Sequence, residues 1–326
     1  MSTSENLREG ECAELQSTRE LDPRLPSVAA FIVGACSDES LFGATAAAIL
    51  QQDYAGNILL VIPEGAELPH ERVHDCADGS RRIVVSPRAS APPELDCNTA
   101  FAMALALQPP PDFLALLHCG ERPPTGWLES LRRAQEEFDA DLVLGPVKAV
   151  FTERPADWMI AGAFFDRLGF QRGPMPRPLA ADNSLIRAAV VRSLLPRIFA
   201  VSAPGESEWI DFAYRVEARG FTSIWANDAI VFDSVPKSRM DEQWVLHCEY
   251  SKAYATARAR CAYQPSRIGA TLRQARALGQ IAAGLASSGV FKLNHFRHLQ
   301  AQMTLARARG TIAGCAGRET QKKEIA

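Results

Sequence analysis

The sequence predicts an α/β protein in which strands and helices alternate around a mostly parallel sheet. Short apolar runs, of the length expected for buried strands, occur at residues 28–33, 58–62 and 113–117. Helical stretches at residues 41–51 and 98–107 lie between them. This alternation is typical of a parallel sheet whose faces are both covered by helices.

The stretch at residues 111–151 is the most complete strand–helix–strand unit. Its first strand ends in the polar cluster at residues 118–121, which reads His-Cys-Gly-Glu, and two prolines follow. Thr125 is predicted to cap the helix after the prolines, and residues 142–144 form the next strand. Ligands of open α/β sheets bind at the carboxyl ends of the strands, so this cluster is the predicted centre of a binding site.

Composition excludes several classes of function. The 326 residues carry a net charge of −3, which gives no electrostatic basis for binding nucleic acid. The eight cysteines show no CxxC spacing, which argues against a zinc site or a disulfide framework. They are predicted to be mostly buried, reduced thiols of a cytoplasmic protein.

The chain divides into three predicted regions. Residues 1–27 are polar, lack the apolar core of a signal peptide and are predicted to be a disordered tail. Residues 28–262 form the α/β domain, with short later strands at 222–225 and 229–232, and residues 263–326 form a helical C-terminal region. No run reaches the roughly 18 apolar residues of a membrane span.

The order of features in the central unit resembles the family 2 glycosyltransferases, in the branch that builds bacterial exopolysaccharides such as succinoglycan. A strand ending in an acidic residue is followed by prolines, a Trp-Leu helix, Ala-Asp and Gly-Pro-Val. The resemblance extends over nearly the whole chain after residue 27. It implies a GT-A fold, which is a Rossmann-like, mostly parallel sheet, with a helical C-terminal appendage.

The same resemblance implies a divalent metal, Mg²⁺ or Mn²⁺, held by an acidic cluster. That cluster usually reads Asp-Asp-Asp-Glu in the family, whereas here only Glu121 is acidic. His118 and Glu121 match the cluster, and Asp233 opens a segment that resembles the family's Glu-x-Val-Pro-x-x-Arg. Because Gly120 offers no ligating side chain, these three residues predict a weak metal site.

The nucleotide-sugar donor is predicted to contact residues at five matching positions, although some of them differ from the family pattern. These positions are Asp38, Glu64, Asn98, Asn183 and Arg239. Asp38 and Glu64 are either donor contacts or ordinary loop and cap residues. Asn183 either lines the site or shapes a turn before a strand, with Asp182 standing where the family has glycine.

A catalytic base is needed because a sugar hydroxyl is a poor nucleophile until its proton is removed. The family's base aligns with Trp209, so Glu208 or Asp211 is predicted to replace it. The alternative is that Glu206 and Glu208 are acids favoured by the helix dipole in the first turn. In a protein without turnover, an exposed Trp209 is predicted to stack on a sugar ring.

Two functions follow from this resemblance. The first is transfer of a sugar from a nucleotide-sugar to a polysaccharide or lipid-linked glycan. The second is a non-catalytic scaffold or regulator of polysaccharide synthesis. The basic C-terminal helices either pack together or contact an anionic membrane, which would place a cytoplasmic protein at the membrane's inner face. The sugar, the acceptor and the stereochemical outcome are not specified by the sequence.

Overall fold

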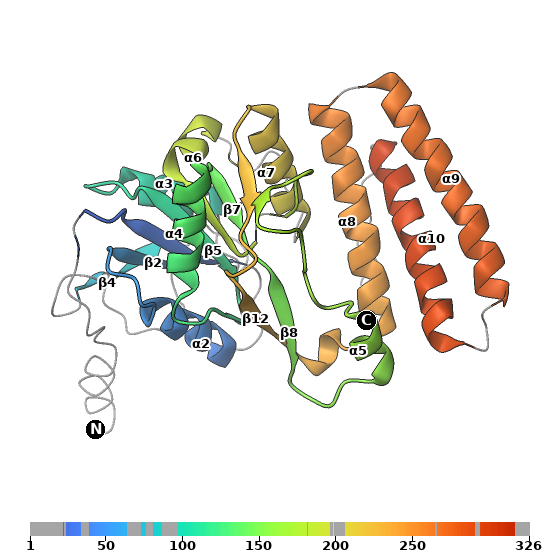
Figure 1. The fold of residues 1–326 in the computed structure, drawn as a ribbon, viewed down its shortest axis with the longest axis horizontal. Coiled ribbons are helices and arrows are strands. Elements are labelled where there is room, and N and C mark those ends of the chain that lie inside the picture. Colours follow the sequence, from blue (N-terminus) through green and yellow to red (C-terminus); the bar gives the residue numbers. More distant parts are fainter. Residues whose placement is uncertain are drawn as a thin grey trace.

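The computed structural model describes residues 22, 24–33, 39–63, 73–75, 81–86, 97–180, 182–195, 198, 206–264, 266–290 and 294–316. Its elements in chain order are β1 (Val28–Val33), α2 (Glu39–Leu50), β2 (Ile58–Pro63), β3 (Val73–Asp75), β4 (Arg81–Ser86), α3 (Cys97–Ala106), β5 (Phe113–His118), β6 (Glu121–Arg122), α4 (Trp127–Phe138), β7 (Leu142–Leu144), β8 (Val147–Phe151), α5 (Asp157–Gly162), β9 (Gly173–Pro174), β10 (Ser184–Arg187), α6 (Ala188–Leu194), α7 (Glu206–Ala218), β11 (Ser223–Trp225), β12 (Val231–Val235), the 3₁₀ helix η1 (Lys237–Arg239), α8 (Glu242–Tyr263), α9 (Arg267–Val290) and α10 (His295–Cys315). Figure 1 shows the sheet with its covering helices on one side of the molecule and α8, α9 and α10 together on the other.

The main sheet is mostly parallel at its centre. Its strand order is β3-β4-β2-β1-β5-β10-β7-β11-β9. The pairs β4–β2, β2–β1, β1–β5 and β7–β11 are parallel, whereas β10 runs antiparallel to both β5 and β7. A smaller sheet of order β6-β12-β8 begins where β5 ends. The predicted α/β class with a mostly parallel sheet is confirmed.

Side chains of the central strands divide between two hydrophobic layers, as the two-residue period of a strand requires. In β1, Ala30 and Ile32 face the layer covered by α2 and α4. Phe31 and Val33 face the opposite layer, which is covered by α3, α6 and α7. Strands buried on both faces explain why the sequence shows continuous apolar runs here instead of alternation.

Helix α4 has the pattern of a half-buried helix. Its buried residues include Trp127, Leu128 and Leu131, which follow one face. Thr125 does not cap it: Gly126 occupies the N-cap position and makes no side-chain hydrogen bond. The predicted helix is therefore confirmed, whereas its predicted cap is wrong.

The C-terminal helices pack side by side. Helix α10 contacts α8 along one side and α9 along another, and α8 also contacts α7 of the α/β region. The close approach of α8 to α10 depends on small residues, because a Cβ on Gly310 would meet the Tyr250 carbonyl oxygen at 2.3 Å. In the described part of the chain, no helix is long and apolar enough to cross a membrane. Most of the predicted tail at residues 1–27 lies outside the described residues.

Candidate functional site

Strand pairing places Glu121 beside Asp233, although they are far apart in the sequence. Glu121 begins β6 directly after the turn that ends β5, and Asp233 is its register partner in β12. Directly opposed residues of an antiparallel pair extend their side chains to the same face of the sheet. Two of the three predicted metal ligands therefore lie together at the carboxyl end of β5.

The turn before Glu121 depends on glycine. Gly120 has a φ of +92°, a region that side chains other than glycine rarely adopt. A Cβ at this position would meet its nearest neighbours, including an Asp233 carboxylate oxygen, only at 3.8 Å. The backbone conformation, and not a lack of space, therefore disfavours an acidic side chain here.

Glu121 is completely buried. Its Oε2 accepts a hydrogen bond of 2.9 Å from the backbone N–H of His118, and its Oε1 accepts one from the Arg167 guanidinium. Burial raises the pKa of the Glu121 carboxyl to about 8, and the positive charge of Arg167 opposes this shift. Both carboxylate oxygens are thus already engaged by protein donors.

Arg167 connects Glu121 to a second buried acid. Its Nη1 lies 2.6 Å from Oδ2 of Asp182, which is only 7% exposed. Sequence reasoning did not identify Arg167 as a site residue, because its partners lie elsewhere in the chain. The sequence feature that could have indicated Arg167 is Asp182, which replaces a glycine of the family 2 glycosyltransferases. A buried acid at this position requires a cation nearby.

Asp233 has an arginine of its own. Arg239 donates from Nη1 and Nη2 to the two Asp233 oxygens, at 3.2 and 3.3 Å, and from Nη2 to the Ser234 carbonyl at 2.6 Å. The guanidinium also lies over the Trp244 ring, 5.8 Å from its centroid. Arg239 was predicted to contact the donor, and its partly exposed side chain remains at this edge of the sheet.

These residues do not fit a divalent cation. A hard cation needs several oxygen ligands with free lone pairs, and here Glu121 is buried against Arg167 while Asp233 is held at both oxygens by Arg239. The His118 Nε2 atom is buried. In the described ranges, no group of three or more His, Cys, Asp or Glu side chains could hold a metal ion.

The amide of Asn183 is used within the protein. It is fully buried, with a φ of +43°, and its Oδ1 accepts a hydrogen bond of 2.7 Å from the Trp127 indole. Its Nδ2 donates to the carbonyl oxygens of Pro146 and Ala229, at 2.8 and 2.9 Å. These contacts support the alternative that Asn183 shapes the turn before β10, and they give its predicted donor contact no support.

Three further residues were predicted to contact the donor, and the structure describes the side chain of one of them, Asn98. The Asn98 Oδ1 accepts a hydrogen bond of 3.1 Å from the backbone N–H of Ile198, which fixes the start of α3 against a neighbouring segment. Asp38 and Glu64 lie outside the residues whose side chains the structure describes. Their role in donor binding stays a prediction.

Asp211 takes part in the contact between α7 and α8. It is 8% exposed on α7, and its Oδ1 accepts a hydrogen bond of 3.0 Å from the Tyr263 hydroxyl at the end of α8. This hydrogen bond engages Asp211 at the contact between α7 and α8, and its predicted role as a base is untested.

The neighbours of Asp211 on α7 have different surroundings. Glu208 lies less than one turn earlier and is half-buried, and its predicted role as a base is untested. Trp209 is only 4% exposed and packs against Phe101 and Phe212. The prediction that Trp209 is an exposed platform for a sugar ring is therefore wrong, because its indole belongs to the core.

Cysteine chemistry differs in part from the prediction. Cys119, in the predicted cluster, is disulfide-bonded, so the expectation of reduced thiols is wrong at this position. Cys248, Cys261 and Cys315 are free, and the sulfur atoms of the last two lie 3.8 Å apart.

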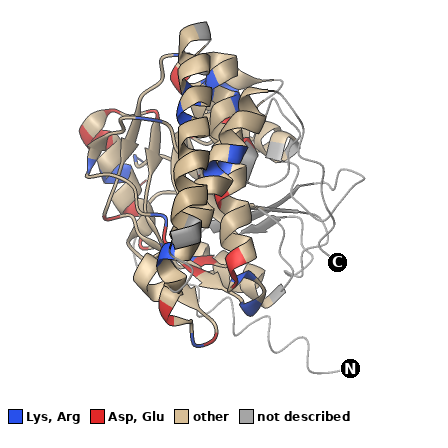
Figure 2. Cartoon of the chain, turned by 90° about the vertical axis from the view of Figure 1, so that its right-hand side faces the viewer, with Lys and Arg blue, Asp and Glu red and all other residues tan. Residues whose placement is uncertain are grey.

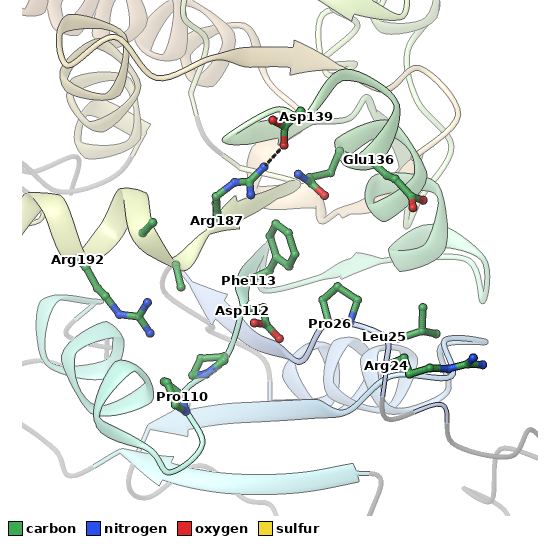
Figure 3. A pocket seen from close by; sticks show the side chains of 14 residues that line it. Arg24, Leu25, Pro26, Pro110, Asp112, Phe113, Glu136, Asp139, Arg187 and Arg192 are labelled. Carbon is green, nitrogen blue, oxygen red and sulfur yellow. Dashed lines mark hydrogen bonds and ion pairs between the residues drawn. The ribbon is translucent and has the colours of Figure 1, made fainter.

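A separate pocket of about 710 Å³ lies at the amino end of the central strand β5 (Figure 3). Its lining includes Phe113, the first residue of β5, and Arg187, the register partner of Phe113 in β10. Arg187 donates to Asp139 at 2.7 Å beside it. The pocket shares no lining residue with the predicted site, which begins at the opposite end of β5.

Comparison with known proteins gives one relative by sequence. No family model matches the chain. Over 136 residues it is 32% identical to the succinoglycan biosynthesis protein ExoM of Rhizobium meliloti (strain 1021), a segment that covers 41% of this chain and 43% of that protein. The chain therefore matches less than half of the length of this curated relative.

Comparison of structures covers nearly the whole chain. The mannosyltransferase PcManGT from Pyrobaculum calidifontis, solved in complex with GDP-Man and Mn²⁺, matches with a TM-score of 0.52 and 14% identity. The match covers 96% of this chain and 95% of that one, and at this identity it shows the fold alone. The GT-A fold and the resemblance to glycosyltransferases of exopolysaccharide synthesis are thereby confirmed.

Proposed function

We propose that this protein transfers a sugar from a nucleotide-sugar donor to a polysaccharide or lipid-linked glycan acceptor. The observation that carries the proposal is the 32% identity to a succinoglycan biosynthesis protein in a chain of GT-A fold. The pairing of Glu121 with Asp233 supports it, because it gathers charged side chains at the carboxyl end of β5, where open α/β sheets bind ligands.

The proposed donor site binds its ligand through arginine more than through metal. Arg239 is partly exposed at the edge of the site and has donors beyond those that hold Asp233. Its guanidinium suits the oxygens of a diphosphate, which accept charge-assisted hydrogen bonds. A weak dependence on Mg²⁺ or Mn²⁺ is expected, since the acids that would hold either ion are bound by arginines.

The proposed base is Glu208. Transfer to a hydroxyl requires a carboxylate near the acceptor, and Asp211 is committed to Tyr263 at the α7–α8 contact. Glu208 lies nearer to the start of α7 than Asp211 does. A lipid-linked acceptor would extend the proposal to a location at the inner face of a membrane.

Calorimetry with UDP, GDP and their common sugars, each with Mn²⁺ or with a chelator, tests the donor proposal. Binding of at least one nucleotide is expected, and it should change little between the two conditions. A second measurement follows transfer in a membrane extract that supplies acceptors. Glu208→Gln should lower the rate by about 10²- to 10⁴-fold, as loss of a general base does.

Asp211→Asn is the matched control, because it removes the same charge from the same helix. It should keep most of the transfer rate. Failure of every nucleotide to bind would contradict the proposed function and favour the non-catalytic alternative. A rate that survives Glu208→Gln would exclude Glu208 as the base while leaving the donor proposal in place.

A further inference from the structure

The charges of this protein are unevenly distributed along the chain. Residues 250–318 contain eleven lysines and arginines and no aspartate or glutamate. The whole chain has a net charge of −3, so the remainder carries −14. Such a separation of charge within one chain indicates a partner of opposite sign for the basic region.

The basic stretch forms most of α8 and all of α9 and α10. Helix α9 is the least covered of the three, because it packs on α10, whereas α10 also contacts α8. Its inner face includes Ala277, which is 1% exposed, and Gly284, which lies against Leu305 of α10. Figure 2 looks onto this side of the molecule, where the long helices in front carry blue, basic segments and red segments lie mainly around them.

Helix α9 also exposes large apolar side chains. Among the described residues, four of the nine exposed large hydrophobic side chains lie on this helix. They are Ile268, Leu272, Leu278 and Leu285, with exposed fractions of 75%, 64%, 60% and 57%. Single exposed apolar residues are ordinary on a protein surface, but four on one helix are a concentration that calls for an explanation.

Helical geometry places Ile268 and Leu272 on the outer side of α9. At 100° per residue, Ile268 lies about 180° around the helix from the buried Ala277, and Leu272 lies about 40° from Ile268. Leu278 and Leu285 are seven residues apart and share one flank of the helix, about 100° and 80° around it from Ala277. Arg276, which is exposed, lies about 40° beyond Leu272.

We propose that the outer face of α9 docks on an anionic phospholipid surface. The exposed side chains of Ile268 and Leu272 would enter the headgroup and acyl boundary, while Arg276 would contact the headgroups. Apolar insertion and basic contacts together give more stable membrane attachment than either does alone. Helix α9 contains three arginines and no acidic residue, so no acid on it would be repelled by such a surface.

A second copy of this chain fits the same face less well. A symmetric dimer through α9 would bring two basic regions of the same sign together, which costs energy unless acids intervene. None is available between residues 250 and 318. Charge complementarity therefore favours an anionic lipid surface over self-association.

The test is co-sedimentation of the full chain with vesicles. One set is phosphatidylcholine alone, and the other contains about one third phosphatidylglycerol, each measured at low and high salt. Binding is expected only to the anionic vesicles, and it should weaken at high salt because the basic contacts are screened. Ile268→Ser combined with Leu272→Ser should lower the partition coefficient by on the order of tenfold.

Arg276→Gln provides a second variant. It should lower the partition coefficient on anionic vesicles by about fivefold, because one basic residue near the membrane surface contributes about that much to binding. The matched control is Leu195→Ser, which removes an exposed leucine that follows α6 and is expected to leave binding unchanged. Circular dichroism would check that each variant is folded. Equal binding to neutral vesicles, binding to neither set, or a lipid-free dimer that the double variant dissociates would each overturn the proposal.

Because vesicle binding is measured without donor or turnover, its result does not depend on the proposed transferase activity.

Discussion

Two acidic side chains predicted to share one site have very different surroundings. Glu121 is fully buried, and the guanidinium of Arg167 joins it to Asp182. Asp211 is nearly as buried, and its Oδ1 accepts a hydrogen bond from the hydroxyl of Tyr263. The first acid belongs to a charged network at the edge of the sheet, whereas the second belongs to a contact between two helices.

This difference shows what a motif can and cannot assign. Matching a family pattern assigned Glu121 to a metal site and Asp211 to a candidate base, two roles that belong to one kind of active site. In the structure Glu121 is held by Arg167, whereas Asp211 accepts a hydrogen bond from Tyr263 at the end of α8. Chemistry at the paired strands and packing at the α7–α8 contact are therefore separable by mutation.

The largest effect is expected from Arg167→Met. The change removes the cation that Glu121 and Asp182 share and leaves both acids buried. Breaking a buried ion pair costs about 3 to 5 kcal/mol, and the lower end of that range applies because Arg167 is 24% exposed and because burial raises the pKa of the Glu121 carboxyl to about 8. Urea denaturation would measure the loss in the free energy of unfolding.

Arg172→Met is the matched control for that loss. Arg172 also pairs with two acids, Glu137 at 2.7 Å and Asp228 at 2.5 Å, but both are about half exposed. Surface pairs contribute about 0 to 1 kcal/mol each, so this variant should lose far less stability. Equal losses in the two variants would contradict the view that Arg167 supports a buried network.

A smaller effect is expected from Arg239→Gln. Removing the guanidinium frees both Asp233 oxygens, for which Arg239 competes with the metal ion. The affinity for Mn²⁺ should therefore rise by about tenfold, which corresponds to the loss of one hydrogen bond to a charged group. Calorimetry with Mn²⁺ alone would measure it. Lys237→Gln removes a charge from the same short helix without touching Asp233, and it should leave the affinity unchanged. Tight Mn²⁺ binding by the unmodified protein would show that Arg239 does not block the site.

The sequence predicted the framework of the fold better than the site. Strands β1 and β7 have their predicted bounds, because continuous apolar runs are specific to strands buried on both faces. Strand β10 was anticipated only as a strand after the Asn183 turn, and its place was not predicted, since residues 184–187 pair antiparallel with strands far away in the sequence. Arg167 was missed for the same reason: Glu121 is 46 residues before it, and no local pattern records that contact.

The predicted site residues also depend on contacts between segments that are far apart in the sequence. Glu121 and Asp233 come together because β6 and β12 pair in register, which the family motifs anticipated. Asn183 was placed near the donor by its motif, yet its hydrogen bonds to Trp127, Pro146 and Ala229 are long-range contacts that appear only in the folded chain. Motif order thus indicated which segments meet, but not which side chains remain available.

The smallest effect is expected at the α7–α8 contact. Burial, and secondarily the charge of Asp211, raises the pKa of Tyr263 to about 12. Asp211→Asn keeps a hydrogen-bond acceptor but removes the charge, so the pKa of Tyr263 should fall while staying above the ordinary value of 10.0, because the burial remains.

A tyrosine pKa raised by folding contributes stability that is fully present below pH 10 and is lost as the pH rises towards 12. The variant should therefore lose about 1 kcal/mol at neutral pH, the worth of one hydrogen bond, and show a smaller additional loss on alkaline titration. Ultraviolet titration of tyrosinate, with Tyr263→Phe subtracted to isolate this hydroxyl from the other tyrosines, would measure the shift. An unchanged Tyr263 titration would argue against the contact with Asp211. Complete loss of transfer in a folded Asp211→Asn protein would instead return Asp211 to the catalytic site and remove the distinction between the two acids.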